Sequence, residues 1–405
     1  ARAAVRLGDV RGMLDEWAEA LQAYRTAESL FDAATPPAGN DESIAIDCAN
    51  CKISIGNALK ELGQHAESEQ ALRFALAALE LLVRDRPNSP ACRDSLATCC
   101  VNLSMLQYDA GAPDKAVETL SAAIRELTAL ADLPSAEPRH RFALGRARIK
   151  MGHMLGDRGD TRGAAAVLRD AVAIFDSLGK ADPNHPDYAE GRATAFVTLA
   201  DTLRLQGRDR EAMSAFESAI DEYGALMTVL PDVPHYREFN AATRTDVAQF
   251  LHAIGMNPDA KSQLDSALAT FQALADERPL LPKYHEEIVW AQTTLGQVLA
   301  DLGQNEDAAT TIRSAVERAT ALVRNYSNFG YAERLAVSRS NLGRVLGKLG
   351  HHEEAEQELT AAIHEMQRLI RSDPANPPRY QDELAWSFQS LGDLLNAMGR
   401  QLAAR

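Results

Sequence analysis

The stretch NLGRVLGKLGHHEEAEQELTAAI (residues 341–363) places its smallest residues at fixed intervals. Gly343 follows a leucine, Gly350 comes seven residues later, and Ala355 and Ala362 lie five and twelve residues beyond Gly350. The apolar residues between them recur at spacings of three, four and seven, which is the pattern of a helix with one buried stripe. The stretch therefore predicts two helices that meet at a glycine turn.

The same spacing recurs along the whole chain. If Gly343 is taken as an anchor, the equivalent residues are separated by steps of 47, 48 or 49 residues. The nine anchors are Gly8, Gly56, Ser104, Gly152, Ala200, Ala248, Gly296, Gly343 and Gly392. A regular period of this length indicates a repeat array rather than two or three globular domains. We therefore predict a single array over residues 1–405 with nine units, of which the first and the last are truncated.

Two further positions also recur at a fixed distance from the anchors, and we call each set of equivalent positions a column. A glycine lies seven residues after every anchor except the first, where Asp15 replaces it. An alanine lies nineteen residues after each anchor that the chain follows that far: Ala27, Ala75, Ala123, Ala171, Ala219, Ala267, Ala315 and Ala362. The glycine suits the left-handed residue that closes a helix, and the small anchors and alanines let two helices approach closely. These columns predict where the helices of each unit turn and cross.

Proline-rich links such as RPNSPAC (residues 86–92) and DPNHPDY (residues 182–188) separate the copies. Proline lacks a backbone donor and disfavours helix in the residue before it, so each link ends the second helix of its unit. Each unit is then a helix, a glycine turn, a longer helix and a link, with helices of about 20 residues and about 30 Å. The link tyrosines are expected to pack against a helix end: Tyr188, Tyr236, Tyr284 and Tyr380.

These columns resemble the tetratricopeptide repeat. The residues that carry the resemblance most clearly are Leu342, Gly343, Leu346, Gly350, Ala355, Leu359 and Ala362. The chain departs from the family in its longer period, about 48 residues against the usual 34 or so, and in lacking the expected tryptophan of the first turn. It is similar to long-helix repeat regions of bacterial multidomain proteins, including those that follow Ser/Thr kinase domains. The resemblance implies an all-α, right-handed α-solenoid of helix-turn-helix hairpins, whose first helices line a concave groove for peptides or proteins.

The composition excludes some classes of partner. The net charge is -15 and the pI is about 5.2, and such a surface repels phosphate backbones, so we expect no nucleic-acid partner. No apolar stretch approaches the roughly 18 residues that cross a bilayer, and the first residues lack the apolar core of a signal peptide. We predict a cytoplasmic protein without a membrane span. The truncated end units also lead us to expect covalent continuation into a larger chain.

No motif of an enzyme emerges from the sequence. It lacks the glycine-rich phosphate loops, the G-x-S-x-G elbow and the kinase signatures, so we predict no catalysis and no cofactor. Cys48, Cys51, Cys99 and Cys100 raise the question of zinc. However, Cys51 and Cys99 share a column that holds alanine, serine or threonine in the other copies, and cysteine packs as a small apolar residue. We therefore predict no metal site.

The groove columns lie six, three and two residues before each anchor, and one and four after it. Four residues there match the carboxylate clamp of chaperone-binding tetratricopeptide domains: Asn57, Asn102, Arg146 and Lys150. The fifth position, a lysine in that family, is Ile53. The resemblance implies that the asparagines pair with a peptide backbone and that the two cations hold a terminal carboxylate. Trp290 and Trp386 lie six residues before their anchors, in the same column as Arg146. The sequence leaves open whether they line the groove or the core.

The sequence thus predicts a non-enzymatic scaffold that binds a protein or a peptide in its concave groove. The alternative is a regulatory or assembly arm of a larger enzyme, such as a bacterial Ser/Thr kinase, with the catalytic domain outside this chain.

Overall fold

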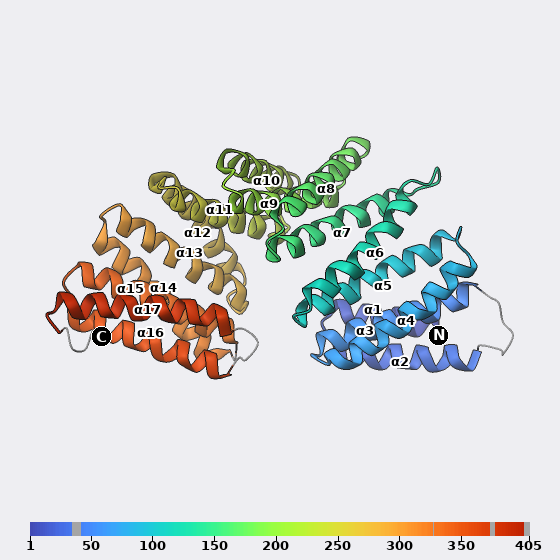
Figure 1. The fold of residues 1–405 in the computed structure, drawn as a ribbon, viewed down its shortest axis with the longest axis horizontal. Helices are drawn as coiled ribbons and strands as arrows, with labels where there is room; N and C mark the ends of the chain where they lie inside the picture. The colour runs from blue at the N-terminus through green and yellow to red at the C-terminus, as the bar shows by residue number, and fades with distance from the viewer. Residues whose placement is uncertain (35–41, 327, 373–376, 401–405) are drawn as a thin grey trace. The chain divides into compact units, whose positions relative to one another are not determined.

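The computed structural model describes residues 1–34, 42–326, 328–372 and 377–400, which form seventeen α-helices and no strand (Figure 1). The helices are α1 (Arg2–Met13), α2 (Trp17–Ala34), α3 (Glu42–Glu61), α4 (His65–Asp85), α5 (Pro90–Asp109), α6 (Pro113–Ala131), α7 (Pro138–Asp157), α8 (Thr161–Ala181), α9 (Pro186–Leu205), α10 (Asp209–Val229), α11 (Pro234–Ala253), α12 (Asn257–Glu277), α13 (Pro282–Asp301), α14 (Asn305–Asn325), α15 (Phe329–Lys348), α16 (His352–Ser372) and α17 (Pro377–Ala397). The predicted all-α repeat fold is confirmed. No helix in these residues combines the length and low polarity needed to cross a membrane.

The chain divides into two compact units, residues 1–218 and 219–405, with the boundary inside α10. Every anchor lies in an odd-numbered helix. In hairpins such as α3/α4 and α13/α14, this helix packs against the even-numbered helix that follows it (Figure 1). Within each unit, odd-numbered helices also contact the next odd-numbered helix, as in α3 with α5 and α13 with α15. Among the described residues, the backbones of successive even-numbered helices do not approach each other as closely. The odd-numbered helices therefore form the inner layer of each unit.

The link prolines begin helices as well as end them. Six odd-numbered helices start at a proline: Pro90, Pro138, Pro186, Pro234, Pro282 and Pro377. Proline is favoured there because the first helical N–H has no partner within the helix, and the fixed φ of proline already suits the helix.

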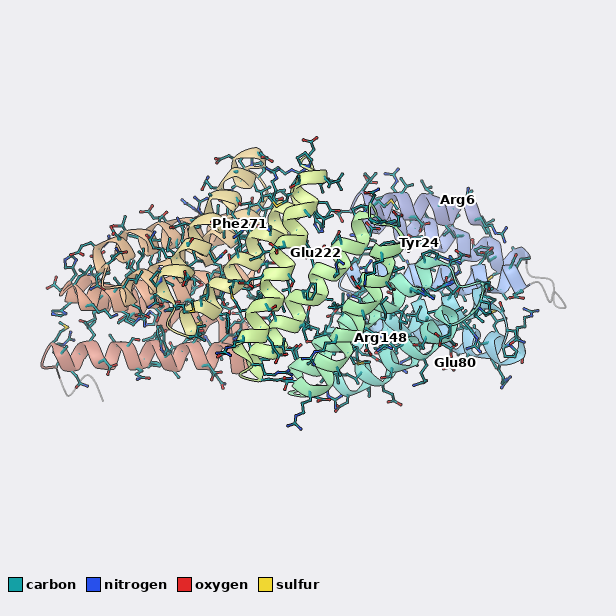
Figure 2. The ribbon with its side chains drawn as sticks, turned by 90° about the horizontal axis from the view of Figure 1, so that it is seen from above. Arg6, Tyr24, Glu80, Arg148, Glu222 and Phe271 are labelled. Carbon is teal, nitrogen blue, oxygen red and sulfur yellow. The ribbon has the colours of Figure 1, made fainter. Side chains whose placement is uncertain are left out.

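The link tyrosines lie in the first turn of the helix that each link introduces, and all four are buried. Phe271, which Figure 2 labels, lies near the end of α12. Tyr284, for example, packs with Phe271 and Leu274. The predicted packing against a helix end is confirmed for this tyrosine, which joins the α11/α12 hairpin to α13.

The turn glycines adopt the left-handed conformation that the sequence predicts. Eight of them have φ between 68° and 81°, and nothing lies within 4 Å of the position that a Cβ would take. Asp15, which replaces glycine in the first repeat, has φ of 59° and takes the same conformation. The backbone conformation, not a lack of space, therefore selects glycine at these turns.

The anchors are small because a large side chain of the second helix lies directly against them. A Cβ added to Gly296 would lie 2.1 Å from Ile312, and one added to Gly152 would lie 2.4 Å from Leu168. In both of these repeats, the large residue comes sixteen positions after the anchor. The alanines nineteen positions after the anchors are all fully buried, with 0% exposure. The predicted close crossing of the two helices is thus confirmed.

Side chains also join the ends of successive odd-numbered helices. A residue four positions after one anchor pairs with an aspartate five positions after the next. The pairs are Lys60–Asp109 (3.0 Å), Tyr108–Asp157 and His252–Asp301 (2.9 Å). Because these groups are partly exposed, each pair contributes about 1 kcal/mol or less, and apolar packing supplies most of the stability.

Gly159→Ala and Gly156→Ala should have opposite effects, although open space surrounds both glycines. Gly159 has φ of 80°, so alanine there should cost about 1–2 kcal/mol. Gly156 is within α7, where alanine should stabilise by about 0.5–1 kcal/mol. Urea denaturation with hydrogen exchange of α7 and α8 measures both. Effects of the same sign would contradict the assignment of the turn.

Ala315→Trp should destabilise α14 by about 1–3 kcal/mol, because Ala315 is fully buried where the helices cross. Thr310→Trp is the control, since Thr310 is exposed on the same helix and its replacement should change stability by less than about 0.5 kcal/mol. Thermal unfolding compares the two variants. A neutral Ala315→Trp would show that this column is not a crossing point.

Candidate functional site

A pocket of about 350 Å³ lies between the first helices α5 and α7 of two successive hairpins, with Leu127 of α6 also lining it. Its polar lining includes Asn102 of α5, and Arg146 and Lys150 of α7. Asp94 of α5 also lines it and pairs with Arg139 at 3.8 Å. Its apolar lining includes Phe142 of α7. We call this the α5/α7 pocket. It belongs to the inner layer of the first unit because both of its main helices are odd-numbered.

The structure brings together three of the four residues that match the clamp. Asn102, Arg146 and Lys150 all line the α5/α7 pocket. Asn57 lies on α3, where it is partly buried, and it does not line the pocket. Ile53 is 4% exposed, so the position that holds a lysine in the family is here part of the core. The first helix of the preceding hairpin therefore adds neither an asparagine nor a cation to the pocket lining.

The two cations of the pocket have no carboxylate within 4 Å among the described residues. Burial lowers the pKa of Lys150, and the nearby positive charges of Arg146 and Lys60 lower this pKa further. Lys60 itself pairs with Asp109 at 3.0 Å. Three cations therefore lie close together on the inner layer, and two of them are available to an anion.

The groove columns of the sequence predict only part of the apolar lining of the pocket. Val101 and Met105 fall in the predicted groove columns, but Phe142 and Leu127 do not. A signal was present at Phe142, ten positions before its anchor. Of the eight copies that include this position, six have a carboxylate there: Asp94, Glu190, Glu238, Glu286, Glu333 and Asp382. The guanidinium carbon of Arg146 lies 5.9 Å from the centre of the Phe142 ring, close enough for a cation–π contact.

In the second unit, the same groove columns satisfy one another. Gln297 donates to the side-chain oxygen of Asn341 at 2.8 Å, and Arg344 donates to the same oxygen at 3.1 Å. The guanidinium of Arg344 also lies over the Trp386 ring, 4.9 Å from its centre. Because these polar groups are already paired, this surface offers an anion less than the α5/α7 pocket does.

Both groove-column tryptophans are partly buried rather than fully enclosed. Arg334 covers Trp290 with its guanidinium carbon 4.1 Å from the ring centre, as Arg344 covers Trp386. The choice that the sequence left open is therefore resolved in favour of a surface position in contact with arginine.

The cysteines occupy packing positions. The thiols of Cys51 and Cys99 donate to the carbonyl oxygens of Tyr24 and Leu72, each at 3.3 Å. Burial raises the pKa of both thiols to about 12, which disfavours the thiolate that a metal requires. Over the described ranges, no three His, Cys, Asp or Glu side chains are grouped to hold a metal ion.

Comparison with known proteins supports the repeat fold. Residues 289–314 and 336–359 match the model of the tetratricopeptide repeat. The quorum sensor NprR of B. thuringiensis in its apo form is similar in structure, with a TM-score of 0.52, 15% identity, and coverage of 98% of this chain and 96% of that chain. The apo form of RapI has a TM-score of 0.53 at 13% identity, with coverage of 80% and 98%.

A third similar structure is PH0952 of Pyrococcus horikoshii, a signal transduction ATPase with numerous domains that has a tetratricopeptide repeat sensor. Its TM-score is 0.53 at 12% identity, and the match covers 95% of this chain but 50% of that chain. No curated protein matches this sequence. These similarities confirm an all-α helical repeat solenoid.

Lys150→Met should stabilise the protein by about 0.5–2 kcal/mol at pH 7, because it removes a partly buried charge close to two like charges. The folded-state pKa of Lys150 is lowered, so the charged lysine disfavours folding below that pKa. The advantage of the variant should therefore shrink as the pH rises through the folded and then the unfolded pKa of Lys150.

Urea denaturation at several pH values measures this difference. Lys261→Met is the control, since Lys261 pairs with Asp265 at 2.7 Å on the exposed face of α12 and should give no gain. A less stable Lys150→Met at pH 7 would show that Lys150 has a structural role.

Proposed function

We propose that this tetratricopeptide-like repeat protein is a non-enzymatic scaffold that binds an extended peptide segment of a partner protein along the inner layer of its first unit. One observation carries the proposal. Asn102, Arg146 and Lys150 converge on one pocket, and neither cation has a carboxylate partner in the described part of the chain. We assign to this pocket the C-terminal carboxylate of the peptide.

The chemistry of the pocket fits this ligand. The Arg146 guanidinium presents a planar set of donors, and the Lys150 ammonium adds a nearby positive charge, so that together they bind a carboxylate through charge-assisted hydrogen bonds. The Asn102 amide has both donors and acceptors, which a peptide N–H and C=O can use together. Because Lys150 is already partly desolvated, it loses less hydration when a ligand covers it than a fully exposed lysine would.

The apolar lining adds selectivity for the residue next to the carboxylate. Val101 and Met105 of α5 and Phe142 of α7 present aliphatic and aromatic surface beside the cations. An apolar side chain of the peptide that enters this space gains about 0.8 kcal/mol for each buried methylene group. We therefore propose that the preferred ligand combines a free carboxylate with an apolar side chain.

Residues of α3 would contact the peptide further from its end. Asn57 is partly exposed on this helix, and Lys60 lies close enough to influence the charge of Lys150. We assign these two residues to the backbone and side chains that precede the C-terminal residue. The cytoplasmic location and the exclusion of nucleic acid stay predictions of the sequence.

A second candidate is a regulatory or assembly arm of a larger enzyme. The similarity to half of the PH0952 chain, a signal transduction ATPase with a tetratricopeptide repeat sensor, favours it. In that arrangement, the α5/α7 pocket would bind its peptide in the same way and report it to a catalytic domain elsewhere. The gene around this chain distinguishes the candidates, because only the second requires an enzyme domain in the same reading frame.

Eight-residue peptides that end in leucine with a free carboxylate should bind at least about tenfold more tightly than their C-terminal amides. Arg146→Ala/Lys150→Ala should remove most of this preference, because these side chains supply the charge-assisted bonds. Fluorescence anisotropy with labelled peptides measures both effects.

Arg141→Ala is the matched control, since Arg141 is exposed on α7 outside the pocket and its loss should leave binding unchanged. Equal affinity for acid and amide, or equal losses in the double variant and the control, would exclude the α5/α7 pocket as a carboxylate site.

A further inference from the structure

The second helices of the first unit contribute to a different pocket. It lies between α8 and the turn that joins α9 to α10, and its volume is about 600 Å³. The lining consists of Thr161, Arg162, Ala165, Arg169, Gln206 and Arg208. We call it the arginine pocket. Three guanidinium groups meet here on a chain whose net charge is -15.

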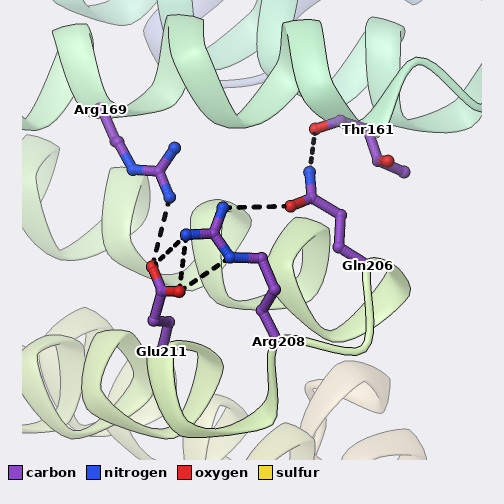
Figure 3. Close-up of polar contacts among 5 residues, drawn as sticks. All are labelled: Thr161, Arg169, Gln206, Arg208 and Glu211. Atoms are coloured by element: carbon purple, nitrogen blue, oxygen red, sulfur yellow. Dashed lines mark hydrogen bonds and ion pairs between the residues drawn. The ribbon is translucent and has the colours of Figure 1, made fainter.

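Hydrogen bonds hold two of the arginines in place (Figure 3). Glu211 accepts from Arg208 at 2.8 and 2.6 Å, and from Arg169 at 3.5 Å. Gln206 donates to the carbonyl oxygen of Thr161 at 2.5 Å, and its own side-chain oxygen accepts from Arg208 at 3.4 Å. Arg208 is therefore oriented before any ligand arrives, which reduces the entropy lost on binding.

The charges of the arginine pocket do not balance. Glu211 is the carboxylate that pairs with Arg169 and Arg208, and Arg162 has no carboxylate partner within 4 Å among the described residues. Other carboxylates of α8 and its cap are engaged elsewhere. Asp160 accepts from the backbone of Gly163 at 2.9 Å, for example. Three guanidinium groups thus share one ion-pair partner, the Glu211 carboxylate.

The second unit has an equivalent place between α14 and the turn that joins α15 to α16. The contacts there show which ones the repeat fold itself requires. There Arg313 of α14 pairs with Glu354 of α16 at 2.9 Å. These residues lie at the repeat positions of Arg169 and Glu211. An arginine–glutamate pair between successive second helices is therefore a shared structural feature.

The remaining groups of the arginine pocket are particular to the first unit. The repeat positions of Arg162 and Arg208 are occupied in the second unit by Glu306 and His351, and that of Gln206 by a leucine. His351 lies 3.9 Å from Glu354, so a contact between the Arg208 position and the glutamate is shared by the two units. The second unit forms these contacts with a glutamate at the Arg162 position, so structural support does not account for Arg162.

We propose that the arginine pocket binds a phosphate monoester. At neutral pH this group has a charge of about -1.5 to -2, which suits a pocket where three guanidinium groups share one carboxylate partner. Its three terminal oxygens accept the paired donors that planar guanidinium groups present. The exposed position of the arginines leaves room for the molecule that carries the phosphate. The site is separate from the α5/α7 pocket and does not depend on peptide binding there.

Titration calorimetry at low salt with inorganic phosphate and with a phosphoserine peptide tests the proposal. Both probes should show saturable binding below about 10 mM, and the unphosphorylated peptide should not bind. Arg162→Ala/Arg208→Ala keeps the Arg169–Glu211 pair and should weaken binding at least about tenfold. Glu211→Gln removes the one negative charge and should tighten binding at least about threefold, an effect that a purely structural role would not produce.

Glu354→Gln is the matched control, because it removes the equivalent pair in the second unit and should leave phosphate affinity unchanged. Circular dichroism and thermal unfolding establish that each variant is folded. Binding of inorganic phosphate without the phosphoserine peptide would overturn the assignment to a monoester and identify the free ion as the ligand. Absence of saturable binding of either probe, or unchanged affinity in folded Arg162→Ala/Arg208→Ala, would overturn the proposal.

Discussion

The structure depends on the contact between a very small residue of one helix and a large residue of the next. At Gly8, Gly152, Gly296 and Gly343, a Cβ would lie within 2.6 Å of a side chain sixteen positions later. Because the interior of a protein is closely packed, a methyl group at such a site forces the helices apart. The left-handed turn between the helices brings the two residues together. The close approach then sets the geometry of each hairpin, and each hairpin buries its remaining apolar face against its neighbours.

Because the buried columns determine how the helices pack, the surface residues of the hairpins can differ from copy to copy. The buried columns hold the same small or apolar residues throughout, whereas the groove columns change from copy to copy. In the second unit, Gln297, Asn341 and Arg344 bind one another. In the first unit, no described carboxylate lies within 4 Å of Arg146 or Lys150. Equivalent positions on one repeat fold thus give a closed polar network in one place and an open cationic pocket in another.

The two proposed sites use different layers of the same unit and different chemistry. The α5/α7 pocket combines cations with an amide and an apolar wall, which suits the end of a peptide. The arginine pocket lies against second helices and has guanidinium groups without an apolar wall of comparable size, which suits a compact anion. Each lies between successive hairpins, because a groove between neighbouring repeats is where side chains from separate helices converge.

The sequence by itself determined the period, the type of secondary structure and the points where helices turn and cross. These features depend on residue size and backbone conformation at single positions, as with Gly159 and Ala315, so a repeating column is enough to reveal them. It also indicated Asn102, Arg146 and Lys150, since column positions predict which face of a helix a residue occupies. Only the tertiary structure decided that Asn57 lies outside the pocket, that Phe142 lines it, and that Arg162, Arg169 and Arg208 meet. Those outcomes depend on the distance between separate helices and on which charges find partners, and neither is encoded in the period of the repeat.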